Sequence, residues 1–324
     1  MLNKKLLKTI AVFFVFLLLI IIPFVNLPRY VIRILVFSGI YILLASSLNF
    51  SSGIAGQVSL GHAAYFGIGA YTSALLALKL NFSFPVCMIF ALVTTGALGF
   101  LVSIPAVRLS GAYLAIVTLG FGQIVNIIML NWLDVTRGPM GLVSIPPPML
   151  FGFEFSSPGS YYYLVLITCI LTLLFFNNLI KSKFGRNLMA LRDDENAAVA
   201  MGINISRDKV IALTISSAIA GIAGALYAHF MLFISPSSFT GEESTAILSM
   251  VVLGGLGNMT GSVFSALILT ALPELLRDFS QYRMLVYGFL LVIMMILKTW
   301  NWDNFALVRK LRNDKRFKFL QRER

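Results

Sequence analysis

Apolar runs long enough to cross a bilayer are the feature that most restricts how this chain can fold. A transmembrane helix needs about 20 consecutive apolar residues, and runs of this kind recur along the sequence. They lie at 9–25, 34–50, 63–78, 85–107, 112–132, 161–180 and 210–234, with further apolar sequence at 244–275 and 284–297. Charged residues make up only 12% of the chain, against about 25% in a soluble globular protein. The sequence therefore predicts an all-α, polytopic integral membrane helical bundle.

The first apolar run follows a basic segment that contains Lys4, Lys5 and Lys8, as the apolar part of a secretory signal does. The run is long for a signal, and no small-x-small cleavage site follows it. We therefore expect it to be retained as the first membrane helix.

The net charge of +12 is concentrated in three places. Basic residues cluster near the N-terminus, at 181–209 and at 298–324, whereas the Pro- and Gly-rich segment 134–159 has a single Arg. Because cytoplasmic loops carry an excess of Lys and Arg, we expect both termini and 181–209 in the cytoplasm and 134–159 outside. Residues 1–300 then form one transmembrane domain with a cytoplasmic loop at 181–209, and residues 301–324 form a basic cytoplasmic tail. Such clusters suit anionic lipid better than nucleic acid.

The segment 244–275 must enter and leave the membrane on one side in this orientation. Six spans return the chain to the cytoplasm at 181, the span 210–234 leaves it, and the last span must start outside. At about 1.5 Å per residue, the piece 244–254 is too short to cross roughly 30 Å of hydrocarbon. We therefore expect a re-entrant, broken-helix hairpin that turns at 254–261, with Gly254, Gly255 and Gly257 as its hinge.

A second helix break is expected in the segment 53–80, which is apolar but carries Gln57, Ser59 and His62 among several glycines. Small residues let helices approach closely, and the glycines at 53–59 allow the backbone to unwind. The sequence therefore predicts a broken helix at the centre of the bundle. Packing of small residues without a role in any pathway is the alternative.

Charge is scarce inside the apolar runs. No Asp or Glu lies in the middle of a run, and the only two histidines, His62 and His229, are far apart in sequence. A proton relay needs an intramembrane carboxylate, and a membrane hydrolase needs a nucleophile with a base or a metal. The sequence also lacks the G-x-x-x-x-G-K-[ST] phosphate loop. We therefore expect no enzyme activity, no metal and no cofactor, but an uncharged membrane pathway that another polypeptide drives.

The loop 181–209 is the most specific feature of the chain. Residues 187–201 have a helix-forming composition with apolar and small residues near helical spacing, and Gly202 is placed to end that helix. A short helix between two membrane spans, polar on one side and apolar on the other, suits docking into a groove on a soluble partner. A solvated connector is the alternative.

This loop resembles the segment of ABC-importer permeases that carries the E-A-A-x-x-x-G pattern. In GRNLMALRDDENAAVAMGINISRDKVIAL, the triplet at 196–198 and Gly202 occupy the positions of that pattern, with Asn in place of the first Glu. In that family the loop forms a coupling helix that grips the ATPase. The residues that this resemblance implies in coupling are Arg192, Asp193, Asp194, Glu195, Asn196, Ala197, Ala198 and Gly202.

Four further stretches are together similar to the LivH/LivM family of branched-chain amino acid permeases. They are GQVSLGHAAYFGIGAY, RLSGAYLAIVTLGFGQIVNIIMLNW, TRGPMGLVSIP and MVVLGGLGNMTGSVFSALILTALPELLR. The resemblance covers 40–297 and implies the transmembrane permease subunit of an ABC-type importer in a bacterial inner membrane. It implies leucine, isoleucine and valine as substrates.

The same resemblance implies a second, related permease, two ATPase subunits and an extracytoplasmic binding protein as partners. Related permeases carry urea, short amides or sugars, so these substrates are alternatives. A stand-alone secondary carrier and a non-transporting scaffold are alternatives of other classes. The missing mid-span carboxylate and the docking loop count against the carrier, and the broken helices count against the scaffold.

Neutral polar side chains within the spans are the candidates to line a translocation path. They are Gln57, Ser59, His62, Tyr113, Thr118, Gln123 and Asn126. An external binding protein would supply recognition and leave such a path weakly selective. The alternative is that these side chains form hydrogen bonds between helices.

Overall fold

The computed structural model describes residues 28–275 except 110 and 151, together with residues 288 and 292. The apolar runs predicted at 9–25 and 284–297 and the basic tail at 301–324 lie outside the described residues, apart from those two positions. The chain separates into two compact units, Met1–Leu275 and Leu276–Arg324. The helices and strands named below all belong to the first unit.

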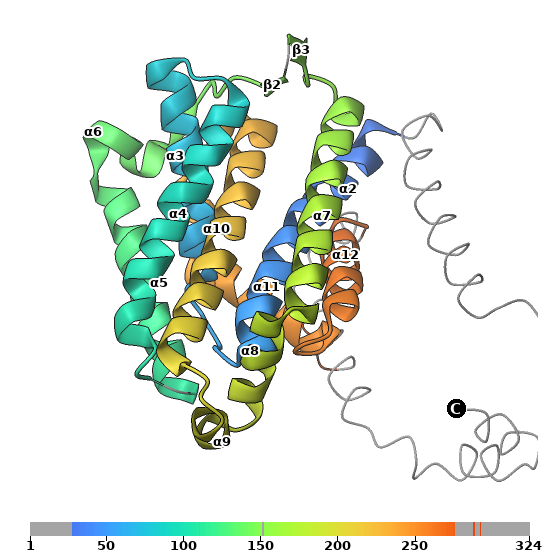
Figure 1. The fold of residues 1–324 in the computed structure, drawn as a ribbon. Helices are drawn as coiled ribbons and strands as arrows, with labels where there is room; N and C mark the ends of the chain where they lie inside the picture. Colours follow the sequence, from blue (N-terminus) through green and yellow to red (C-terminus); the bar gives the residue numbers. More distant parts are fainter. Residues whose placement is uncertain (1–27, 110, 151, 276–287, 289–291, 293–324) are drawn as a thin grey trace, which may run out of the picture. The chain divides into compact units, whose positions relative to one another are not determined.

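Six segments of the first unit are long and apolar enough to cross a membrane. They are α2 (Arg29–Asn49) with the π-helix η2 (Phe50–Ile54), α3 (His62–Leu80), α4 (Phe84–Ala106), α5 (Gly111–Asn131), α7 (Pro158–Lys181) and α10 (Ile205–Met231). They run approximately along one common direction (Figure 1). The prediction of an all-α polytopic membrane bundle is confirmed.

Shorter elements lie between these spans or follow α10. The helical ones are α6 (Leu133–Thr136), η3 (Gly138–Met140), α8 (Lys183–Asp193), α9 (Glu195–Ala200), η4 (Pro236–Ser238), α11 (Gly241–Gly254) and α12 (Met259–Leu275). Strand β1 (Leu142–Val143) pairs antiparallel with β4 (Phe233–Ile234), and β2 (Met149–Leu150) pairs antiparallel with β3 (Phe153–Glu154).

Helix α10 is the central helix of the bundle and packs closely against α3 and α4 through small residues. A Cβ atom on Gly69 of α3 would clash with the backbone of Gly221, and one on Gly221 would clash with Thr95 of α4. A Cβ on Gly99 of α4 would likewise clash with Ser217. Van der Waals packing at small residues drives such helix contacts, because apolar side chains gain nothing by leaving lipid.

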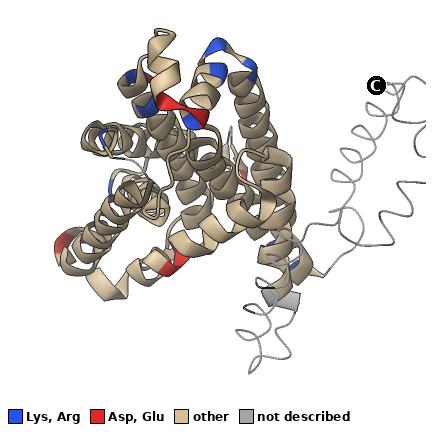
Figure 2. Cartoon of the chain, turned by 90° about the horizontal axis from the view of Figure 1, so that it is seen from below, with Lys and Arg blue, Asp and Glu red and all other residues tan. Residues whose placement is uncertain are grey.

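The loops 134–159 and 181–209 lie at opposite ends of the bundle. Helices α8 and α9 are at one end of Figure 1, and strands β2 and β3 are at the other. Figure 2 looks onto the α8–α9 end and shows basic residues clustered on one side of it. The arrangement agrees with the opposite sides that the charge pattern predicts for the two loops.

The single helix predicted over 187–201 is wrong, because the structure has two helices there. The backbone of Asp194 is extended, at φ −156° and ψ 111°, and its carboxylate accepts hydrogen bonds from the amides of Asn196 at 2.9 Å and Ala197 at 3.0 Å. An Asp side chain that caps the next helix in this way competes with continued helix. The predicted stop at Gly202 is confirmed, since its φ is +80°.

The predicted break near Gly254 is present as a four-residue turn, 255–258, between α11 and α12. Gly255 and Gly257 both have positive φ, at +98° and +83°, which glycine adopts without the Cβ penalty. Gly254 and Gly261 face each other so closely that a Cβ on either would clash with the other's backbone. The two helices therefore form a tight hairpin.

Candidate functional site

The first helix break lies between η2 and α3. After Ile54 the chain has no regular helix until His62, and Gln57, Ser59 and His62 in this stretch are all buried. Non-helical backbone within a membrane protein persists only where protein covers it and supplies hydrogen bonds. Here the amide of Gln57 donates to Ser51 O at 2.9 Å, and the amide of Leu60 donates to Thr118 Oγ1 at 3.0 Å.

The three predicted path residues of this break differ in their partners. His62 Nε2 lies 2.8 Å from Ser47 Oγ on α2, and Ser59 Oγ accepts from the amide of Gly61 at 3.3 Å. Gln57 Oε1 is buried and has no hydrogen-bond partner among the described residues. A buried polar atom without a partner costs free energy unless water or a ligand meets it. Gln57 is therefore the one of the three with a buried side-chain atom that has no partner among the described residues.

The four predicted path residues on α5 do not form one cluster. Thr118 is buried and meets the first break, whereas Tyr113 is 73% exposed on the outer surface of α5. Asn126 donates from Nδ2 to Pro236 O at 2.9 Å. Gln123 is exposed, and its Nε2 lies 3.1 Å from where a Cβ on Gly241 would be. Thus Gln123 and Asn126 face the stretch that leads into α11.

That stretch, 232–240, contains β4 and η4 and leads from α10 into α11. The ring of Phe239 lies against those of Phe66 at 5.1 Å, Tyr71 at 6.0 Å and Tyr227 at 5.9 Å. Helix α11 then begins inside the bundle, where Ser244 Oγ accepts a hydrogen bond from the amide of Ala63 at 2.9 Å. The first turns of α3 and α11 therefore meet in the interior.

Sequence reasoning missed two residues of this meeting point, Glu243 and Ser244. The hairpin was expected to start at 244, so Glu243 was counted outside the apolar sequence. In the structure it lies in the first turn of α11, and its Oε1 is buried without a hydrogen-bond partner among the described residues. Its side chain also bonds Tyr41 of α2. The pair of acidic residues at 242–243 is a helix-start signal that would have placed α11 correctly.

Several charged side chains of the docking loop form hydrogen bonds and ion pairs within the chain. Glu195 is paired with Lys209 at the start of α10, at 2.5 Å, and Asp194 caps α9. Asp193 pairs with Arg192, whose guanidinium also donates from Nη1 to Gly53 O at 3.0 Å. The charges predicted for partner contact are therefore engaged within the chain.

The exposed residues within 197–202 of the docking loop are small or apolar, whereas those before them, at 192–194 and 196, are charged or polar. Met201 is 82% exposed and Val199 is 49% exposed. Asn196, Ala197 and Gly202 are exposed as well, whereas Ala198 points inward and is only 4% exposed. The face that a partner could touch is therefore Ala197 with its neighbours at 199–202.

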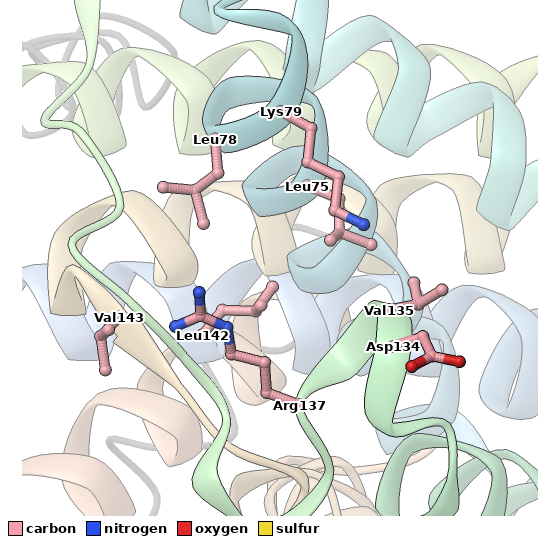
Figure 3. Close-up of a pocket in the computed structure, with 8 residues that line it drawn as sticks. All are labelled: Leu75, Leu78, Lys79, Asp134, Val135, Arg137, Leu142 and Val143. Carbon is pink, nitrogen blue, oxygen red and sulfur yellow. The ribbon is translucent and has the colours of Figure 1, made fainter.

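A surface pocket of about 300 Å³ lies near the other end of the bundle. Figure 3 shows Lys79 at the end of α3 and Arg137 after α6 among its lining residues. The full lining is Leu75, Leu78, Lys79, Asp134, Val135, Arg137, Leu142 and Val143. No predicted path residue lines this pocket. Among the described residues, no group of His, Cys, Asp and Glu could hold a metal ion.

A bundle of six apolar helices, with a buried helix break after η2 and a second break between α11 and α12, defines a multi-pass membrane protein. The chain belongs to the family of branched-chain amino acid transport system permease components, whose model matches residues 30–297. This is a transport family and not a family of catalytic enzymes.

Several relatives carry descriptive names. The chain is 42% identical over 280 residues to the high-affinity branched-chain amino acid transport system permease proteins LivM of Salmonella typhimurium and Escherichia coli. These matches cover 79% of this chain and 66%, just under two thirds, of each relative.

More distant relatives cover the chain to a similar extent. It is 31% identical over 284 residues to a probable branched-chain amino acid transport permease protein LivM of Methanocaldococcus jannaschii, covering 77% of this chain and 82% of the relative. It is 28% identical over 268 residues to the autoinducer 2 import system permease protein LsrC of Salmonella typhi, covering 76% and 72%. No solved structure matches the chain.

Proposed function

We propose that this chain is the transmembrane permease subunit of an ABC-type importer that moves leucine, isoleucine and valine into the cytoplasm. The observation that carries the proposal is the family match over 30–297 together with 42% identity to two LivM permeases. In this proposal a second, related permease completes the membrane pathway, two ATPase subunits drive it, and an extracytoplasmic binding protein delivers the substrate.

The chemistry of the interior supports a neutral or zwitterionic substrate. The first break offers Gln57 with an unused buried oxygen, and the neutral side chains of Ser52 and Thr118 hydrogen-bond to the backbone of the break. A zwitterion has no net charge, so a path of neutral hydrogen-bonding groups can pass it without a fixed counter-charge. Candidate path residues are Gln57, Ser59, His62, Tyr113, Thr118, Gln123 and Asn126, with the interior ones favoured by their burial.

The proposed orientation follows from the charges. The α8–α9 end lies in the cytoplasm with both termini, and the end with the strands lies outside. Residues 1–300 then act as the permease domain, and 301–324 as a basic tail at the cytoplasmic surface. The exposed face around Ala197 contacts the ATPase, since the exposed apolar residues of the loop lie there.

Uptake in membrane vesicles tests the function. The chain is expressed with the ATPases, the second permease and the binding protein encoded beside it, and radiolabelled leucine is the probe. We expect leucine accumulation that requires ATP and the binding protein and that persists when an ionophore collapses the proton gradient. Accumulation that follows the proton gradient and ignores ATP would contradict the importer.

Two alternatives have specific observations behind them. The 28% identity to the autoinducer 2 import permease LsrC supports a different small polar substrate, and competition of leucine uptake by urea, short amides or sugars would detect one. A stand-alone proton-coupled carrier needs an interior carboxyl, and Glu243 is a candidate for it. Under the carrier, Glu243→Gln abolishes uptake; under the importer, uptake persists.

A further inference from the structure

Arg192 occupies an unusual place at the end of α8. Its Nε and Nη2 both bond Asp193 Oδ1, at 3.0 Å and 2.9 Å, on the exposed side. Its Nη1 reaches the opposite way and donates to Gly53 O at 3.0 Å, across 139 positions of sequence. One guanidinium therefore joins the docking loop to η2, the last turn of the α2–η2 span.

The position of Gly53 O at a helix end favours interaction with a positively charged group. It lies in the π-helical turn η2, where the following amides bond elsewhere: Ala55 N donates to Phe50 O and Gln57 N to Ser51 O. The last carbonyls of a helix lack amide partners, and the negative end of the helix dipole attracts a positive group. π-helical turns are also frequent at functional sites.

The second helix break meets the same point. A Cβ on Gly53 would clash with the amide of Gly257, and one on Gly257 would lie 3.0 Å from Arg192 Nη1. The amide of Gly257 donates to Asn49 Oδ1 at 2.8 Å, and Asn49 Nδ2 donates to Ser262 Oγ on α12 at 2.8 Å. Arg192 thus lies against the end of α2–η2 and against the turn of the α11–α12 hairpin at once.

We propose that Arg192 is a positioning residue that ties the docking loop to both helix breaks. A displacement of α8 and α9 would then move Gly53 and Gly257 together, and with them the break that leads to α3 and the turn that joins the end of α11 to α12. This inference rests on the proposed function only in that an ATPase supplies the displacement.

The competing explanation is an ordinary surface ion pair. The side chain of Arg192 is 37% exposed and that of Asp193 is 68% exposed, and exposed pairs of this kind contribute little to stability. The two explanations differ in which bond matters. Asp193→Asn weakens the ion pair but leaves the bond to Gly53, whereas Arg192→Gln removes the charge from both.

Matched variants come from the same helix. Arg186 is also on α8, and its Nη1 donates to Lys181 O at 2.9 Å, only five positions away. Arg186→Gln therefore removes a charged hydrogen bond to a carbonyl, but this bond joins two residues that both lie within 181–209. Arg192→Lys keeps the charge near Gly53 O and should recover part of whatever Arg192→Gln loses.

Hydrogen exchange of the purified permease complex, with and without its ATPases, is the test. In Arg192→Gln we expect peptides covering 53–58 and 254–258 to exchange roughly tenfold faster, as for the loss of a charged hydrogen bond that limits local opening. Arg186→Gln and Asp193→Asn should match the parent, and Arg192→Lys should lie between. ATPase binding should alter exchange at 254–258 in the parent but not in Arg192→Gln, while the ATPases still co-purify.

Unchanged exchange at both breaks in Arg192→Gln, or an equal effect of Arg186→Gln, would overturn the inference. Loss of the ATPases from Arg192→Gln would also overturn it, since Arg192 would then be a docking contact. Leucine uptake is measured in parallel. If the parent fails to take up leucine, the proposed substrate is wrong, but the exchange comparison still decides the role of Arg192.

Discussion

The two helix breaks of this protein are built differently. The break between η2 and α3 is long, carries buried polar side chains such as Gln57 and His62, and is held by bonds to neighbouring helices. The turn at 255–258 is short, relies on Gly255 and Gly257 with positive φ, and exposes Leu256 by 49%. The first break brings polar chemistry into the interior, whereas the second gives the backbone freedom to turn. They touch at Gly53 and Gly257.

The largest effect should come from filling that contact. Gly53→Ala places a Cβ against Asn49 Oδ1 and the amide of Gly257, so either the backbone moves or the hydrogen bond between those two groups breaks. Overpacking costs roughly 1–3 kcal/mol, and the lost bond adds to it. The yield and thermal stability of purified permease measure the effect. Gly120→Ala on α5, where no atom lies within 4 Å, should be neutral or stabilising. Equal stability of the two variants would show that the breaks are not in contact.

The next largest effect is expected at the exposed face around Ala197, which we propose contacts the ATPase. Ala197→Trp places a large side chain on an exposed surface, so the permease should remain folded while the ATPase is held away. A penalty of roughly 1–3 kcal/mol corresponds to about 5- to 150-fold weaker association. Pull-down of the ATPases from membranes measures it, with Val143→Trp at the opposite end as the control. Normal pull-down of Ala197→Trp would make 181–209 a passive connector.

Substitution of two glycines that have the same φ can distinguish the cost of backbone strain from the cost of a lost contact. Gly257 and Gly152 both have φ of +83°, but Gly152 has open space around it and Gly257 faces Arg192. Valine at either position meets the left-handed penalty of roughly 1–2 kcal/mol. Gly257→Val should therefore reduce stability and uptake more than Gly152→Val, and the difference measures the contact. Equal losses would reduce the second break to an ordinary surface turn.

A pair of variants, one of which should have the smallest effect on stability, distinguishes structural from path groups within the first break. Ser47→Ala leaves the buried His62 ring nitrogen without its partner, which costs roughly 1–3 kcal/mol. Gln57→Leu removes an oxygen that already has no partner, so stability should change little while leucine uptake falls. Thermal unfolding and vesicle uptake of both variants are the measurements. Parental uptake in Gln57→Leu would remove Gln57 from the path.

The sequence alone determined the membrane class, the existence of both breaks and the stop at Gly202. These features depend on local properties: apolar length, glycine's freedom at positive φ, and the charge of connecting segments. The same reasoning failed at Asp194, where a side chain that caps α9 competed with helix continuation.

Only the tertiary structure decided which groups meet. Arg192 contacts Gly53 across 139 positions, and Asn49 contacts Ser262 across 213. The stretch 232–240, which contains β4 and η4, places Phe239 against Phe66 and leads into the first turn of α11, where Glu243 Oε1 is buried. Such pairings depend on how helices with nearly uniform apolar surfaces pack around α10. That packing depends on the close approach of Gly69 and Gly221. The order of apolar residues along the sequence does not show which small residues will meet in this way.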